Sequence, residues 1–145
     1  MTNRKINEEV LNNLYKNAHI AMQCISDLLP EVKDSGLKEE LLYQFDGYKS
    51  IINDISLYLD KKGITPEDIG VIQKTMMKGA IKFKTMTDVS RNHVADMMIK
   101  GSIMGINELA AMRNESENYD DEVADFIARL LHLEEEYERR LRKFL

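Results

Sequence analysis

Apolar residues recur along most of this chain at spacings of three and four positions, which predicts helices. The clearest stripe lies between Asp120 and Leu145. A helix there would place on one face Val123, Phe126, Ile127, Leu130, Glu134, Tyr137, Leu141 and Phe144. This face is apolar except for the carboxylate of Glu134 and the phenol of Tyr137. Because an inward carboxylate costs free energy unless it has a partner, Glu134-x-x-Tyr137 is a site, the remnant of one, or a solvated edge.

Two long helices are expected in the first half of the chain. The first covers about 7–29 and stops at Pro30, because proline disfavours helical geometry in the residue before it. In the short turn that follows, Ser35 is the better N-cap candidate for a second helix that runs to about Lys61. Gly63 fits a left-handed C-cap. The expected buried face of the second helix consists of Leu41, Phe45, Tyr48, Ile52, Ile55 and Leu59.

A third helix is expected to start at residues 65–68. This Thr-Pro-Glu-Asp segment combines a capping hydroxyl, a proline at the first helical position and an acid that can reach back. A bend near Thr87, followed by Asp88 or Ser90 as a cap, separates it from a fourth helix over about 91–114. One continuous helix is the alternative, although about 50 residues would be far longer than usual.

The fourth expected helix is apolar on two sides. One stripe consists of Val94, Met97, Met98, Gly101, Gly105, Leu109 and Met112, and the other of Ala95, Ile99, Ile103 and Ile106. A helix of this kind is central or buries its second face in a partner. We therefore expect a homo-oligomer through Ile99, Ile103 and Ile106. The spacing Gly101-x-x-x-Gly105 would let another backbone come close, although each glycine costs about 1 kcal/mol relative to alanine.

Charged residues crowd the end of the last expected helix. Acids precede bases there, which suits the helix dipole and indicates a solvated helix surface. The expected pairs, four residues apart, are Glu135 with Arg139, Glu136 with Arg140, and Glu138 with Arg142.

Length and composition narrow the class of protein. A chain of 145 residues fits one all-α domain over 1–145. The formal net charge of −5 argues against nucleic acid as a partner. The single cysteine, Cys24, excludes an intramolecular disulfide and fits a reducing compartment. There is neither a signal-peptide pattern nor a run of roughly 20 apolar residues, so we expect a cytoplasmic protein without a membrane partner.

The common catalytic motifs are missing from the sequence. It has no glycine-rich phosphate loop, no Gly-x-Ser-x-Gly elbow and no His-Glu-x-x-His. The histidines, His19, His93 and His132, do not form a nucleophilic arrangement with Cys24 in the sequence. An enzyme is therefore the less favoured interpretation.

The order of the helices, the Thr-Pro start of the third segment and the closing segment 131–145 together resemble the ferritin-like superfamily. The resemblance is to small bacterial proteins related to rubrerythrin and bacterioferritin, and it covers nearly the whole chain. It implies a ferritin-like antiparallel four-helix bundle with an additional helix in the crossover. It also implies a di-iron centre, built from an inward Glu on each of two helices and Glu-x-x-His on each of two others.

Carried onto this sequence, that ligand set is mostly replaced. The inward position of the first helix is Met22, and the second helix offers Phe45 and Tyr48. The fourth helix has Ser102 where the acid would stand, and the last helix keeps Glu134 but has tyrosine in place of histidine. We therefore expect Glu134 to be a relic held by a hydrogen bond from a core tyrosine.

Three functional interpretations remain open. The first is a structural or interaction protein with a ferritin-like bundle, no working di-iron centre and no cofactor. The alternative is a metal-binding oxidase or storage protein that holds iron or manganese at a reduced site of Glu134, Glu108 and Asp46 with one histidine. A third is a small-ligand pocket in the bundle core, lined by the methionines and by Tyr15, Tyr48 and Tyr137.

Overall fold

The computed structural model describes residues 3–65 and 88–145, and the expected third helix lies outside the described residues. The described residues form α-helices and short 3-10 helices and contain no strand, which confirms the all-α class. These elements are α1 (Asn3–Leu28), α2 (Ser35–Lys61), α4 (Arg91–Asn114), η1 (Ser116–Asn118), α5 (Asp121–Leu141) and η2 (Arg142–Phe144). None of the described helices is both long and apolar enough to cross a membrane.

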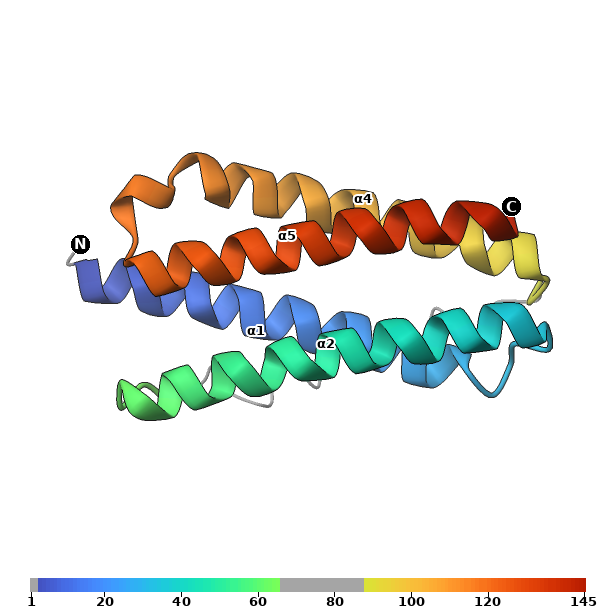
Figure 1. Cartoon of the computed structure of the whole chain (residues 1–145), viewed down its shortest axis with the longest axis horizontal. Helices are drawn as coiled ribbons and strands as arrows, with labels where there is room; N and C mark the ends of the chain where they lie inside the picture. The colour runs from blue at the N-terminus through green and yellow to red at the C-terminus, as the bar shows by residue number, and fades with distance from the viewer. Residues whose placement is uncertain (1–2, 66–87) are drawn as a thin grey trace.

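The four α-helices lie side by side in a bundle (Figure 1). α1 and α5 run in one direction along it, and α2 and α4 run in the other. α2 packs on α1, α4 packs on α5, and α5 also contacts both α1 and α2. α1 and α4 make few direct contacts. The bundle is thus two helix pairs joined mainly through α5, with a looser seam between α1 and α4.

Local capping chemistry sets both ends of α2. The N-cap is Asp34 and not Ser35, so that expectation was wrong. The Asp34 side chain accepts a hydrogen bond from the backbone N–H of Leu37 at 2.8 Å, and the carboxylate satisfies a free donor of the first turn. At the other end Gly63 has φ 67°, and its N–H donates to the carbonyl of Asp60 at 3.1 Å. The left-handed glycine cap is confirmed.

The fourth helix begins after a short non-helical segment, residues 88–90. Ser90 is extended, with φ −62° and ψ 152°, and α4 begins at Arg91. The backbone N–H of Ser90 donates to Asp88 Oδ1 at 2.9 Å. The alternative of one continuous helix through this point is therefore wrong.

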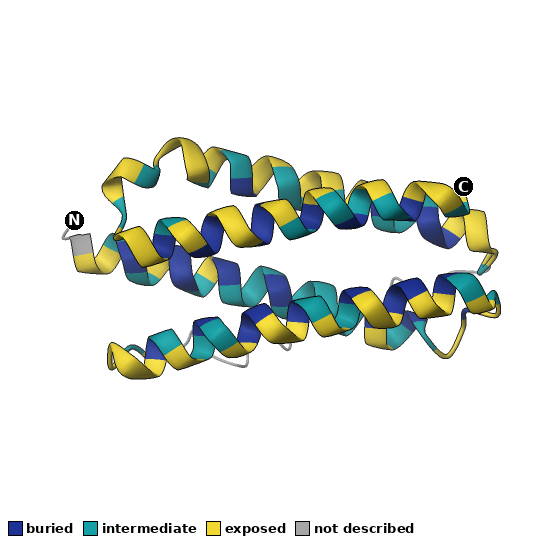
Figure 2. Ribbon diagram, in the orientation of Figure 1, coloured by how far each residue is buried: buried dark blue, intermediate teal, exposed yellow. Residues whose placement is uncertain are grey.

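Each helix turns its buried side towards the bundle interior (Figure 2). On α5 the expected stripe is confirmed, with Phe144 in η2 half-buried. On α2 the buried face is rotated from the expected one: it includes Glu40 and Gln44, whereas Phe45 is only half-buried. The interior of this bundle therefore contains more polar groups than hydrophobic periodicity predicts.

α4 is a peripheral helix. Ile99 is buried, Ile106 is half-buried, and Ile103 is 42 % exposed. Only one member of the expected self-association surface is therefore open to solvent in the described chain. Homo-oligomer formation through this face stays a prediction.

Gly47 brings α2 and α5 close together. A Cβ atom at this position would overlap the phenol oxygen of Tyr137 and would lie 3.3 Å from Leu133 Cδ1. Gly101 on α4 is the opposite case, because a Cβ there meets nothing within 4 Å.

We expect Gly47→Ala to lower the free energy of unfolding by about 1–3 kcal/mol, because the buried ring of Tyr137 must move. Gly101→Ala is the matched control and should raise it by about 1 kcal/mol through helix propensity alone. Urea denaturation followed by circular dichroism measures both changes. Equal stability of the two variants would contradict the close approach at Gly47.

Candidate functional site

The carboxyl group of Glu134 lies inside the bundle, against the backbone of α4. Glu134 is 6 % exposed. A Cβ atom on Gly105 would lie 2.9 Å from Glu134 Oε2. Gly105 therefore makes room for a carboxyl group, whereas the sequence pattern suggested room for another helix backbone.

Tyr48, on α2, supplies the hydrogen bond that Glu134 needs. Its hydroxyl donates to the Glu134 carboxylate, and Tyr48 is itself 4 % exposed. The structure thus places a core tyrosine beside Glu134, as expected. No buried side-chain nitrogen or oxygen of the described residues lacks a hydrogen-bond partner.

Burial dominates the acid–base behaviour of this pair. It raises the pKa of Glu134 to about 7, against the lowering effect of the Tyr48 hydrogen bond, and the negative charge of Glu108 adds a further increase. Burial, and then the charge of Glu134, also raise the pKa of Tyr48 well above its ordinary value. Near neutral pH Glu134 therefore exchanges between its neutral and charged forms.

A cavity of about 320 Å³ lies between α1 and α4 and is lined by Glu134. Gln44 and Tyr48 of α2 also line it. Most of the wall is apolar and comes from side chains such as Ile20, Ala21, Cys24, Met97 and Met98. A largely apolar cavity with a few polar groups and one acid of shifted pKa is the usual form of a small-molecule site.

The other acids of the expected metal site fall in different places. Glu108 is exposed at the cavity, where its Oε2 accepts a hydrogen bond from Asn17 Nδ2 at 3.3 Å. Ser102 also lines the cavity. Asp46 is exposed and lines a separate groove between α2 and α5. The structure thus brings Glu108 and Glu134 together and leaves Asp46 apart.

The donors beside Glu134 do not fit a di-iron centre. In residues 3–65 and 88–145 no three side chains of His, Cys, Asp or Glu come together in a way that could hold a metal ion. His19 is half-buried against the ring of Tyr15 at a centroid distance of 4.5 Å, and burial lowers its pKa. His93 and His132 are exposed. The cavity therefore offers two carboxylates and no imidazole, whereas the di-iron site of a ferritin-like bundle uses both.

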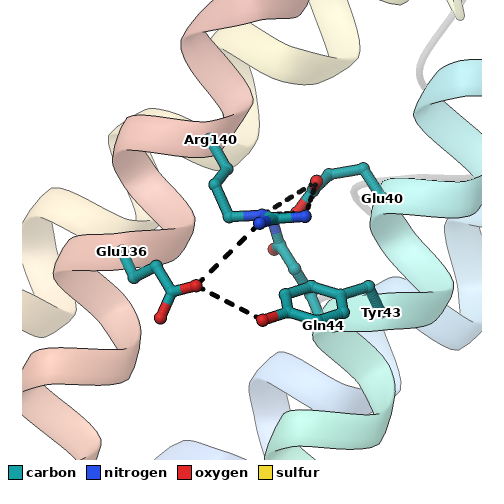
Figure 3. Close-up of polar contacts among 5 residues, drawn as sticks. All are labelled: Glu40, Tyr43, Gln44, Glu136 and Arg140. Atoms are coloured by element: carbon teal, nitrogen blue, oxygen red, sulfur yellow. Dashed lines mark hydrogen bonds and ion pairs between the residues drawn. The ribbon is translucent and has the colours of Figure 1, made fainter.

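Glu40 is a second buried carboxylate that sequence reasoning missed. It is 6 % exposed, and Arg140 of α5 binds it with Nε 3.0 Å from both carboxylate oxygens (Figure 3). Gln44 Nε2 donates to Glu40 Oε2 at 2.9 Å. The expected ion pair of Arg140 with Glu136 is also present but is longer, with Nη1 4.0 Å from Glu136 Oε1. Arg140 lies closer to Glu40 than to Glu136. The pair with Glu40 matters more for stability, because a buried carboxylate without a close cation is strongly destabilising.

Tyr43 completes this network on its outer side. The guanidinium of Arg140 lies 4.1 Å from the centre of the Tyr43 ring, a cation–π contact. The Tyr43 hydroxyl donates to Glu136 Oε1 at 3.3 Å (Figure 3). Because Gln44 belongs to the network and also lines the cavity, the α2–α5 ion pair and the cavity are structurally connected.

One sequence signal could have revealed Glu40. Glu40 and Gln44 continue the 3.6-residue stripe formed by Leu37, Leu41 and Tyr48, so both face inward on any regular helix. The identity of the cation partner had no such signal, because Arg140 is one of several basic residues at the end of the chain.

Comparisons of the chain with protein-family models, with curated proteins and with solved structures find no match.

Removing the Arg140 cation should destabilise the fold. We expect Arg140→Met to lower the free energy of unfolding by about 2 kcal/mol, less than for a fully buried pair because Arg140 is one-third exposed. The double variant Glu40→Gln with Arg140→Met should recover most of this loss, because no unpaired charge remains. Urea denaturation measures both, and Arg139→Met, at an exposed position, is the control. Additive losses in the double variant would contradict the coupling.

Glu134 should make stability depend on pH. Its pKa rises on folding from 4.5 to about 7. Between these two pH values the folded protein therefore holds a proton that the unfolded chain releases. The stabilisation from that proton is complete below about pH 4.5 and is lost as the pH rises through about 7. The loss is at most about 3.5 kcal/mol.

The variant Glu134→Gln imitates the neutral acid and should lack this loss. As the pH rises from about 5 to about 8, the stability of this variant relative to the wild type should therefore increase. Urea denaturation at both pH values measures the change. Glu135→Gln, at an exposed position, should follow the wild type, and a Glu134→Gln profile parallel to the wild type would contradict the assignment.

Proposed function

We propose that this protein is a non-enzymatic binding protein with a ferritin-like bundle, and that its ligand is a small organic molecule held between α1 and α4. The cavity of about 320 Å³ beside the buried Glu134 carries the proposal. Its volume lies at the small end of the roughly 300–1,000 Å³ of ligand pockets. In this interpretation the ligand occupies the space where the resemblance would place a metal centre.

The direction of the helices supports a ferritin-like architecture. α2 and α4 run the same way along the bundle, and α4 begins at the end opposite to the one where α2 ends (Figure 1). A helix of 27 residues, such as α2, is about 40 Å long. Ferritin-like bundles have parallel helices joined by one long crossover connection, whereas up-and-down bundles have only short loops.

The cavity wall favours binding over redox chemistry. Met97 and Met98 stand on the wall, and Ser102 stands where the family's acid would be. Methionine side chains are flexible and polarisable, so they adapt to apolar ligands. These residue types can enclose an organic molecule but cannot supply the ligand set of an oxidase.

Metal binding at a reduced site is the second candidate. It is favoured by one observation, the closeness of Glu108 and Glu134 that lets the charge of one raise the pKa of the other. A divalent ion between two carboxylates would remove this repulsion. Iron or manganese bound stoichiometrically to protein from metal-supplemented cells, and lost in Glu134→Gln, would favour this candidate over the first.

Filling the cavity tests the first candidate. We expect phenethyl alcohol to cause saturable NMR shifts of the methyl groups of Met97 and Met98. Gly101→Leu should weaken binding at least tenfold, because its side chain occupies the cavity. Gly101→Ala is the matched control and should bind almost as the wild type does. Equal binding by the Leu variant would contradict the site.

A further inference from the structure

The two buried carboxylates of the described chain differ in their partners. Glu40 and Glu134 are each 6 % exposed. Glu40 is bound by the guanidinium of Arg140 at 2.9 Å. Glu134 belongs to none of the ion pairs formed by the described residues, and neither does Glu108. One buried acid thus has its cation within the fold, and the other faces a cavity.

The lining of this cavity carries only negative charge. In the described part of the chain its charged residues are Glu134 and Glu108, and no lysine, arginine or histidine contributes to the wall. Its remaining polar groups are neutral and include Asn17, Gln44 and Tyr48. An anionic ligand would be repelled by the two carboxylates, one of which, Glu134, is buried. A neutral ligand would leave a charged Glu134 without a counter-ion.

Polar and apolar groups occupy opposite ends of the cavity. α1 and α4 run in opposite directions (Figure 1), and Asn17 of α1 binds Glu108 of α4. Leu28 follows Asn17 by eleven residues on α1, and Met97 precedes Glu108 by eleven residues on α4. Each separation corresponds to about 16 Å along the helix. One end is therefore acidic and the other apolar, so the site suits an elongated molecule with one charged head.

We infer that the ligand is a small organic cation, with an apolar body and an ammonium head that lies between Glu134 and Glu108. The inference rests on the proposed function, since it names the ligand class of the same cavity. An ammonium group has three donors and no acceptor, and it matches two carboxylates. Its hydrogen bonds to them would be charge-assisted and stronger than neutral ones. The apolar body would lie along the methionines.

Binding of such a cation depends on the charge of Glu134. The titratable groups that act on Glu134 are Tyr48 on α2 and Glu108 on α4. Tyr48 in turn interacts with Tyr137 on α5 and Cys24 on α1. Only Glu134 among them has a pKa raised to about 7. A cation should therefore bind well above this pH and weaken below it, whereas a neutral ligand should bind about equally at both.

Three probes of similar shape test the ligand class: phenethylamine, phenethyl alcohol and hydrocinnamate. Titration of the full chain at about pH 8, followed by calorimetry and NMR, should show the amine binding at least tenfold more tightly than the alcohol. The anion should not bind measurably. At about pH 5 the preference for the amine should disappear, because Glu134 is then neutral.

The variant Glu134→Gln separates charge from shape. It should lose the tenfold preference for the amine at about pH 8 and still bind the alcohol, whereas the control Glu135→Gln should behave as the wild type. If alcohol and amine bind equally to the wild type, the inference about the cation is wrong and the ligand site remains. If no probe binds, the proposed ligand site is itself wrong. A preference for the amine that Glu134→Gln keeps would also overturn the inference.

Discussion

Glu134 can occupy the interior of this bundle only because α4 has no side chain at position 105. The carboxyl oxygen Oε2 lies 2.9 Å from the point that a Cβ atom would take. The same group needs a donor, which Tyr48 provides from α2. One acidic side chain of α5 therefore meets both α2 and α4. The raised pKa follows from this burial.

The two buried carboxylates divide the interior into two parts. Around Glu40 every element of a closed polar network is present: a guanidinium, an amide and an aromatic ring from α2 and α5. This network holds the two helices together. Around Glu134 the described residues supply a neutral donor, the carboxylate of Glu108 and a cavity, but no cation. Gln44 belongs to the Glu40 network and also lines the cavity, so a shift of side chains in one region would move Gln44 in the other.

Periodicity and local chemistry predicted much of the fold. The buried face of α5, the left-handed cap at Gly63 and the break before α4 follow from residues within a few positions of one another. Such features depend on the sequence nearby, whatever the rest of the chain does. The choice of Asp34 over Ser35 as N-cap was missed because both residue types cap well. The extended backbone of Asp34 and its hydrogen bond from the Leu37 N–H distinguish it from Ser35.

By itself the sequence determined that this is an all-α chain with one acid on the inner face of its last helix. Those properties depend on residue type and helical spacing. Only the tertiary structure decided that Arg140 binds Glu40, that Glu108 approaches Glu134, and that Asp46 stands apart. Helical periodicity gives the face on which a side chain lies. It does not give the rotation and axial offset of neighbouring helices, and these decide which charged groups meet.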